Sequence, residues 1–177
     1  MLIGIAVVVV LAIGLLTWVV VAGGDDTGDS AEVVPKVLSA KVGEVAPNFS
    51  LPTLDGGHVE LSDYRGTPVV LNFWASWCTP CRHEFPLLRQ RVGDDPDLAL
   101  VGVNTQDFVE SDGRQFAKDQ HADWPNGFDG DEAVRRGYGV TGLPETFFID
   151  ADGVIRSHVI QGLSAKVLDE QLAKITR

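Results

Sequence analysis

The chain has two cysteines, Cys78 and Cys81, and only Thr79 and Pro80 separate them. The apolar run Val69–Trp74 precedes the pair and predicts a strand, whereas the residues after the pair have helical spacing. Both thiols are therefore expected at a helix N-terminus, where the helix dipole and free backbone N–H groups stabilise a thiolate. This placement predicts thiol–disulfide exchange, with Cys78 as the exposed nucleophile and Cys81, one turn later, as the more buried resolving thiol. The alternative is a structural disulfide that never cycles, but such bridges usually close longer loops.

Composition narrows the possible functions. The 177-residue chain is 45% hydrophobic, enough for a core, and its formal net charge of -11 would repel a phosphate backbone, so no nucleic-acid partner is expected. A structural zinc site takes about four ligands. His83 could join the two cysteines, but no fourth ligand is evident nearby, and no metal or cofactor is predicted. Covalent haem attachment needs C-x-x-C-H, and Arg82 stands where that histidine would be.

The N-terminal region predicts a membrane anchor and a tether. Leu2 to Ala22 is nearly all apolar and uncharged, and about 20 helical residues span a bilayer, so residues 1–22 are expected to form one transmembrane helix. A cleaved signal peptide is the alternative, but its apolar core is usually shorter, about 7–15 residues, and follows a basic leader. Residues 23–42, rich in glycine and acidic side chains, are expected to be a flexible tether.

Residues 43–177 alternate between strand and helix patterns. Strands are expected at 49–51, 58–61, 68–74, 98–103, 146–149 and 154–160, and helices at 81–91, 111–120, 131–136 and 164–174. Turn signals at Asp55–Gly57 and Asp150–Gly153 make two of the strand pairs antiparallel neighbours, and Pro86 is expected to kink its helix. The pattern predicts an α/β domain with a mixed central sheet, helices on both faces and an N-terminal β-hairpin.

Two segments resemble the thioredoxin fold. Asn72–Cys81 is similar to its active-site strand and motif, and Pro86 matches its helix kink. Gly142–Phe147 resembles the loop that carries a cis-proline opposite the disulfide.

A narrower resemblance covers the chain from about Val42 to its C-terminus. Besides the anchor and the hairpin, it depends on Phe128–Asp131, Tyr138–Val140 and Leu143–Asp150. These stretches resemble membrane-tethered thioredoxin-like proteins of cytochrome c maturation, of the DsbE/CcmG and ResA/TlpA type. The resemblance implies a single-pass membrane protein with its domain on the extracytoplasmic side. It would keep the haem-binding cysteines of apocytochrome c reduced and take electrons from a membrane thiol transporter of the DsbD or CcdA kind.

The resemblance also suggests roles for residues beside the dithiol. Glu84 lies on the same helical face as Cys81, matches the acidic residue of the ResA-type pattern, and could raise thiol pKa values or shuttle protons. The alternative is an exposed first-turn acid that complements the helix dipole. Asn72 replaces the buried aspartate of thioredoxin and cannot act as a base, which leaves Glu84 or Glu145 as the acid–base partner.

The remaining predicted site residues concern substrate binding. Trp77 is expected to be a partly exposed platform beside Cys78, and Thr79 and Pro80 to tune the reduction potential. Pro144 is expected to be cis, which would place the Leu143 backbone where an extended peptide can pair with it. Glu145 is expected either to face the substrate groove or to be a solvated loop carboxylate.

Three other functions remain open. Ala46–Phe49 resembles the beginning of peroxiredoxins, although those thiol peroxidases carry a threonine three residues before the reactive cysteine, where this chain has Ala75. A disulfide-introducing oxidant would have the same fold and the opposite direction of electron flow. A binding module with an incidental dithiol is the third.

Overall fold

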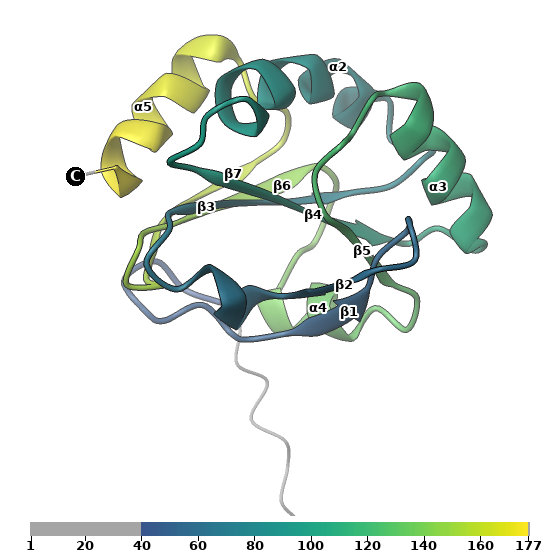
Figure 1. Ribbon diagram of the computed structural model, residues 1–177, viewed down its shortest axis with the longest axis horizontal. Coiled ribbons are helices and arrows are strands. Elements are labelled where there is room, and N and C mark those ends of the chain that lie inside the picture. Colours follow the sequence, from purple (N-terminus) through teal and green to yellow (C-terminus); the bar gives the residue numbers. More distant parts are fainter. Residues whose placement is uncertain (1–39, 177) are drawn as a thin grey trace, which may run out of the picture. The chain divides into compact units, whose positions relative to one another are not determined.

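The computed structural model describes residues 40–176, which contain one five-stranded sheet in the order β5-β4-β3-β6-β7 (Figure 1). Strands β3, β4 and β5 run parallel, whereas β6 is antiparallel to both β3 and β7, which confirms the predicted mixed sheet. The strands are β3 Val69–Trp74, β4 Ala99–Thr105, β5 Asn126–Asp129, β6 Glu145–Ile149 and β7 Ile155–Ile160.

The predicted anchor, residues 1–22, and most of the predicted tether, residues 23–42, lie outside the described residues. Within residues 40–176, no helix is long and apolar enough to cross a membrane.

The sheet is covered on both faces. Figure 1 shows α2, α3 and α5 over one face and α4 with the small sheet β1–β2 over the other. The helices are α2 Thr79–Leu88, the following π-helical turn η2 Arg89–Gly93, α3 Glu110–Asp119, α4 Ala133–Tyr138 and α5 Ala165–Ile175. Strands β1 (Ser50–Pro52) and β2 (His58–Glu60) pair antiparallel, and a short 3-10 helix, η1 (Leu61–Tyr64), follows.

Strand β3 supplies both halves of the core because its side chains alternate between the two faces. Val70 and Trp74 pack beneath α2, whereas Leu71 and Phe73 pack on the side of α4. All six residues of β3 are buried, as expected for a central strand covered on both faces. The same alternation places Asn72 on the face beneath α2.

Two elements differ from the sequence prediction. Strand β5 was not predicted, since Asn126-Gly127 has low strand propensity; it forms because it pairs parallel with β4 at the sheet edge. Helix α2 begins at Thr79, two residues before the predicted start, with Pro80 in its first turn, a position that proline tolerates because its missing N–H has no helical partner. The helix continues through Pro86 to Leu88.

Candidate functional site: a disulfide at the start of a helix

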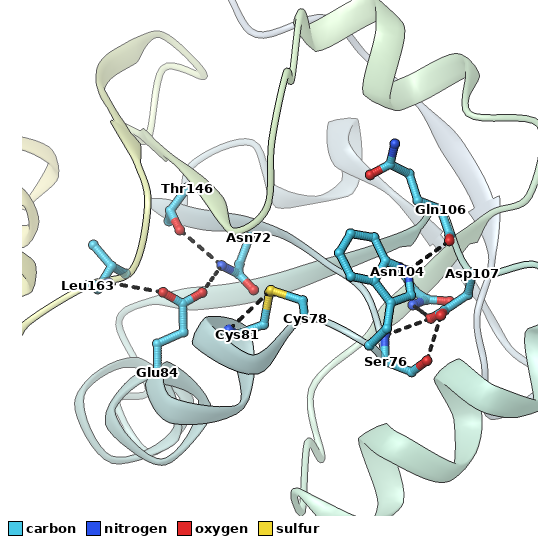
Figure 2. Close-up of a disulfide and its surroundings, with 11 residues drawn as sticks. Asn72, Ser76, Cys78, Cys81, Glu84, Asn104, Gln106, Asp107, Thr146 and Leu163 are labelled. Atoms are coloured by element: carbon cyan, nitrogen blue, oxygen red, sulfur yellow. Dashed lines mark hydrogen bonds between the residues drawn. A yellow bond between two sulfur atoms is a disulfide. The ribbon is translucent and has the colours of Figure 1, made fainter.

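Cys78 and Cys81 form a disulfide at the N-terminus of α2, immediately after β3 (Figure 2). Cys78 is the N-cap of the helix, with an extended backbone, and its Sγ accepts a hydrogen bond from the Cys81 N–H at 3.2 Å. That amide is one of the free donors at the start of a helix, and a thiolate on Cys78 would gain more from it than a neutral sulfur does. The predicted placement of the dithiol is confirmed.

The exposure of the two cysteines differs from the prediction in one respect. Cys78 was expected to be exposed, but its side chain and backbone together are only 3% exposed, against 0% for Cys81. Cys78 is covered because the N-terminus of α2 packs against the core cluster that lies between α2 and the sheet. Thr79 and Pro80, in contrast, are exposed on the outer side of the motif.

Glu84 lies beneath the disulfide on the buried side of α2, one turn after Cys81. It is only 2% exposed, so the alternative of an exposed first-turn acid is wrong. Its Oε1 accepts a hydrogen bond from the Asn72 amide at 2.8 Å, and its Oε2 accepts one from the Leu163 N–H at 3.0 Å. The carboxyl group thus connects α2 to β3 and to the segment before α5.

Burial dominates the proton affinity of Glu84. It raises the pKa of the carboxyl group from 4.5 to about 7, because a buried charge loses its hydration. The hydrogen bonds from Leu163 and Asn72 stabilise the charged form and oppose only part of that rise. A group with this pKa changes protonation near neutral pH, in the range where a thiol–disulfide reaction exchanges protons.

Asn72 fixes the other end of this polar contact. Its Nδ2 donates to Glu84 and also, at 3.0 Å, to Oγ1 of Thr146, which is its direct partner on β6. Asn72 and Thr146 are 1% and 0% exposed. The asparagine therefore occupies a buried polar site between the sheet and α2 (Figure 2).

The loop before β6 carries the predicted cis-proline. The Leu143–Pro144 bond is cis, as the resemblance implied, Pro144 is buried, and Leu143 is half-buried. Leu143 packs against apolar residues of both core clusters.

Glu145 differs from both sequence expectations, because it neither faces a substrate groove nor meets solvent. It is 0% exposed and lies on the α4 face of β6 with Phe147, opposite the face used by Thr146. Its Oε1 accepts hydrogen bonds from the backbone N–H groups of Thr141 and Gly142 at 2.8 and 3.0 Å. Its Oε2 lies 2.7 Å from Nε2 of His158. Glu145 holds the loop in place from the sheet face opposite α2.

A polar cluster on the other side of the disulfide was missed by the sequence analysis (Figure 2). Asp107, at the end of β4, accepts hydrogen bonds from the Ser76 N–H at 2.9 Å, from the Ser76 hydroxyl at 2.6 Å and from the Asn104 amide at 2.6 Å. It fixes the turn that leads from β3 to Cys78. The position was open to inference, because functional groups in α/β folds gather where parallel strands end.

An open groove begins beside Cys78. Trp77 is 58% exposed, as expected for a platform, and its indole N–H donates to the Gln106 carbonyl at 3.0 Å. The groove has a volume of about 530 Å³. It is lined by Trp77, Gln106, Asp107, Phe108, Phe128, Gly130 and Glu132. The groove therefore reaches Trp77, the residue that immediately precedes Cys78.

The sequence that builds this site matches a known family. The model of the AhpC/TSA family matches residues 42–158. The chain belongs to the AhpC/TSA family. Thioredoxin-like protein YneN of Bacillus subtilis (strain 168) is 34% identical over 140 residues, which cover 77% of this chain and 82% of that relative. Thiol-disulfide oxidoreductase ResA of Bacillus anthracis is 34% identical over 140 residues, covering 77% of this chain and 79% of ResA.

Solved structures of DsbE-like thioredoxin folds are similar to this chain. A protein of Chlorobium tepidum described as thiol:disulfide interchange protein DsbE superposes with a TM-score of 0.71 at 35% identity, covering 76% of this chain and 97% of that one. A secreted Mycobacterium tuberculosis disulfide oxidoreductase homologous to DsbE gives a TM-score of 0.65 at 28% identity, covering 71% and 94%. The protein is a thiol-disulfide oxidoreductase of the ResA and DsbE type with a thioredoxin-like fold, and Cys78 and Cys81 are its cysteine pair.

Proposed function

We propose that this protein reduces the haem-binding cysteines of apocytochrome c outside the cytoplasm during cytochrome c maturation. The observation that carries the proposal is the Cys78–Cys81 disulfide at the start of α2 with the buried carboxyl group of Glu84 beneath it, in a chain 34% identical to ResA proteins. Glu84, three positions after the second cysteine, matches the acidic residue of the ResA-type pattern.

The reaction follows from the positions of the two sulfurs. In the reduced protein, the Cys78 thiolate attacks one sulfur of the client disulfide, forms a mixed disulfide and releases one client thiolate, which takes up a proton. The Cys81 thiol then loses its proton and attacks Cys78, which forms the disulfide and releases the second client thiol. Two electrons and two protons pass to the client, and the Cys78–Cys81 disulfide is the product.

Glu84 is proposed to exchange protons with the dithiol during this cycle. Its pKa of about 7 allows it to hold or release a proton at neutral pH. When ionised, the buried charge raises the pKa of the neighbouring Cys81 thiol and keeps that sulfur protonated until the mixed disulfide has formed.

The client is proposed to bind as an extended segment across the N-terminus of α2. The backbone of Leu143, beside cis-Pro144, offers strand-like hydrogen bonds, and the exposed Trp77 provides an apolar platform. Thr79 and Pro80 are the exposed residues of the motif and would contact the client on the outer side.

Membrane attachment is part of the proposal. Residues 1–22 are proposed to anchor the protein by a single helix, with the oxidoreductase domain on the extracytoplasmic side. A membrane thiol transporter of the DsbD or CcdA kind is proposed to return electrons to the disulfide.

The test is covalent trapping. Cys81→Ser leaves Cys78 free to attack and removes the thiol that resolves the adduct, so a stable mixed disulfide with an oxidised apocytochrome C-x-x-C-H peptide is expected on non-reducing gels and by mass spectrometry. Cys78→Ser is the matched control and should trap far less, since its remaining thiol is fully buried. If the peptide gives no adduct while a generic oxidised protein traps readily, the client assignment is wrong.

Thiol peroxidase activity is a second candidate because of the AhpC/TSA family match. Ala75, which stands where peroxiredoxins carry threonine, has no hydroxyl group to bind peroxide. Rapid consumption of hydrogen peroxide at low concentration would favour this candidate over the reductant.

A reduction potential near that of a strong oxidant, about −120 mV, would instead favour disulfide formation in clients.

A further inference from the structure

One buried hydrogen-bond acceptor beside the disulfide has no donor. Asn72 is 1% exposed, and its Nδ2 makes two hydrogen bonds, but its Oδ1 has none. A buried acceptor without a donor is costly and rare in folded proteins, so each one calls for a physical reason. When Glu84 is ionised, the two acceptors of Nδ2 also fix the orientation of the amide, because rotating it would place Oδ1 against the Glu84 carboxylate.

The surroundings of Oδ1 supply that reason. Asn72 belongs to the face of β3 beneath α2, and it is bonded to Glu84, which lies one turn after Cys81 on the same side of the helix. Cys81 is 0% exposed on this side. In Figure 2 the oxygen of Asn72 points toward the sulfur atoms of the disulfide, whereas its nitrogen points toward Glu84 and Thr146.

We propose that Oδ1 of Asn72 accepts a hydrogen bond from the thiol of Cys81 when the disulfide is reduced. A sulfur in a disulfide carries no hydrogen, so the acceptor is without a partner in the oxidised protein. On reduction by a dithiol donor, the S–S bond breaks, the donor becomes a disulfide, and its two electrons and two protons produce the thiols of Cys78 and Cys81. The new S–H of Cys81 is then a donor at the buried sulfur.

The consequence is a preference for the reduced form. The bond exists only after reduction, and the unpaired acceptor exists only before it, so Asn72 shifts the equilibrium toward the dithiol. The bond also stabilises the protonated Cys81 and thereby favours attack by Cys78 first. This inference rests on the redox cycle of the cysteine pair and not on the identity of the client.

The first test measures the equilibrium with a dithiol buffer. Asn72→Leu keeps a similar volume and removes the acceptor; the equilibrium constant for reduction is expected to fall about tenfold, which is a potential about 30 mV more negative for this two-electron couple. Thr146→Val is the matched control, because it removes a hydrogen bond of the same amide and leaves Oδ1 in place; a change below about twofold is expected. Equal shifts in the two variants, or a shift of Asn72→Leu toward the dithiol, would overturn the proposal.

A second test separates the thiol from Glu84, since Asn72→Leu also removes a bond to that carboxyl group. The effect of Asn72→Leu on the unfolding equilibrium is compared in the reduced protein and in a Cys81→Ala background, where the bond to Glu84 is lost in both arms. The proposal is supported if Asn72→Leu increases the unfolding equilibrium constant by about fivefold more in the protein that has the Cys81 thiol than in the Cys81→Ala background. An equal effect in both backgrounds contradicts it.

A third readout leaves Asn72 unchanged. The side-chain ¹³Cγ and ¹⁵Nδ2 resonances of Asn72 are compared in the oxidised and reduced wild-type protein and in Cys81→Ala treated with the same reductant. A shift on reduction that is absent in Cys81→Ala supports the bond, and no shift in the wild type rejects it. All three tests can succeed even if the apocytochrome peptide fails to trap, so the two proposals can fail separately.

Discussion

The side-chain amide of Asn72 donates a hydrogen bond of 2.8 Å to the carboxyl group of Glu84 and joins β3 to α2 beside the disulfide (Figure 2). Both residues are almost fully buried. The pair therefore places a group that titrates near neutral pH between β3 and the helix that begins with the dithiol.

Glu84 is expected to make stability depend on pH. Its carboxyl group has a pKa of about 7 when folded and an ordinary value of 4.5, so between these values the folded state holds more protons than the unfolded state and stability falls as pH rises. The full cost at pH 8 is about 3 kcal/mol, at about 1.4 kcal/mol for each pH unit between the two values. Glu84→Gln removes this fall.

The measurement is the free energy of urea unfolding of the oxidised protein at pH 4.5 and pH 8. Wild type is expected to lose more stability across this interval than Glu84→Gln does. Glu44→Gln, at an exposed position, is the control and should follow wild type. Parallel pH profiles of stability for wild type and Glu84→Gln would show that burial does not raise the pKa of the Glu84 carboxyl group.

Glu145→Ala is expected to destabilise the protein by about 2–4 kcal/mol, because the Thr141 and Gly142 N–H groups and the His158 ring all lose their acceptor. Glu145→Gln retains one oxygen for the two backbone amides and should cost less. Denaturant unfolding of both variants measures which of the two loses more stability. Equal losses in the two variants would mean that the loop requires the charge of Glu145 rather than a neutral acceptor.

Asp107→Ala is expected to slow thiol–disulfide exchange as well as to reduce stability by about 1–3 kcal/mol, since it removes the acceptor of the Ser76 amide and hydroxyl just before Cys78. Reduction of a model disulfide substrate and urea unfolding measure the two effects. The exposed Asp123 provides the control substitution, Asp123→Ala. If Asp107→Ala exchanges thiols and disulfides at the wild-type rate, the Asp107 cluster does not influence the reactivity of the dithiol.

Gly127→Ala is expected to destabilise the protein by about 1–3 kcal/mol because an added Cβ would lie 2.9 Å from Leu51 Cβ, which forces β5 and the β1–β2 sheet apart. Gly137→Ala is the contrasting change: open space surrounds the site, which lies within α4, and alanine has the higher helix propensity. Thermal unfolding should give a lower midpoint for the first variant and an unchanged or higher one for the second. Equal midpoints would mean that β5 and β1 move apart freely.

The dithiol, the order of strands and helices, and the cis-proline loop could be predicted because each has a local signal. Two cysteines at this spacing lie between an apolar strand pattern and a helical one, and Pro144 lies within a recognisable stretch. Strand β5 and the contacts of Asp107 have no such signal. A strand that begins with Asn126-Gly127 is stable only through its pairing with β4, and Asp107 meets Ser76 only after two separate loops approach each other.

The sequence by itself determined that a cysteine pair stands between a strand and a helix of an α/β domain, because spacing and periodicity are properties of neighbouring residues. The resemblance of Asn72–Cys81 and Gly142–Phe147 to known segments added the thioredoxin-like fold. Only the tertiary structure decided what the two glutamates do. Glu84 and Glu145 were both candidates for acid–base chemistry, and packing separates them: the alternation of β6 turns Glu145 to the α4 face, whereas α2 directs Glu84 to the site beneath the disulfide. The proton affinity of Glu84 was likewise undetermined until its burial was known, because hydration is lost only when other elements cover the carboxyl group.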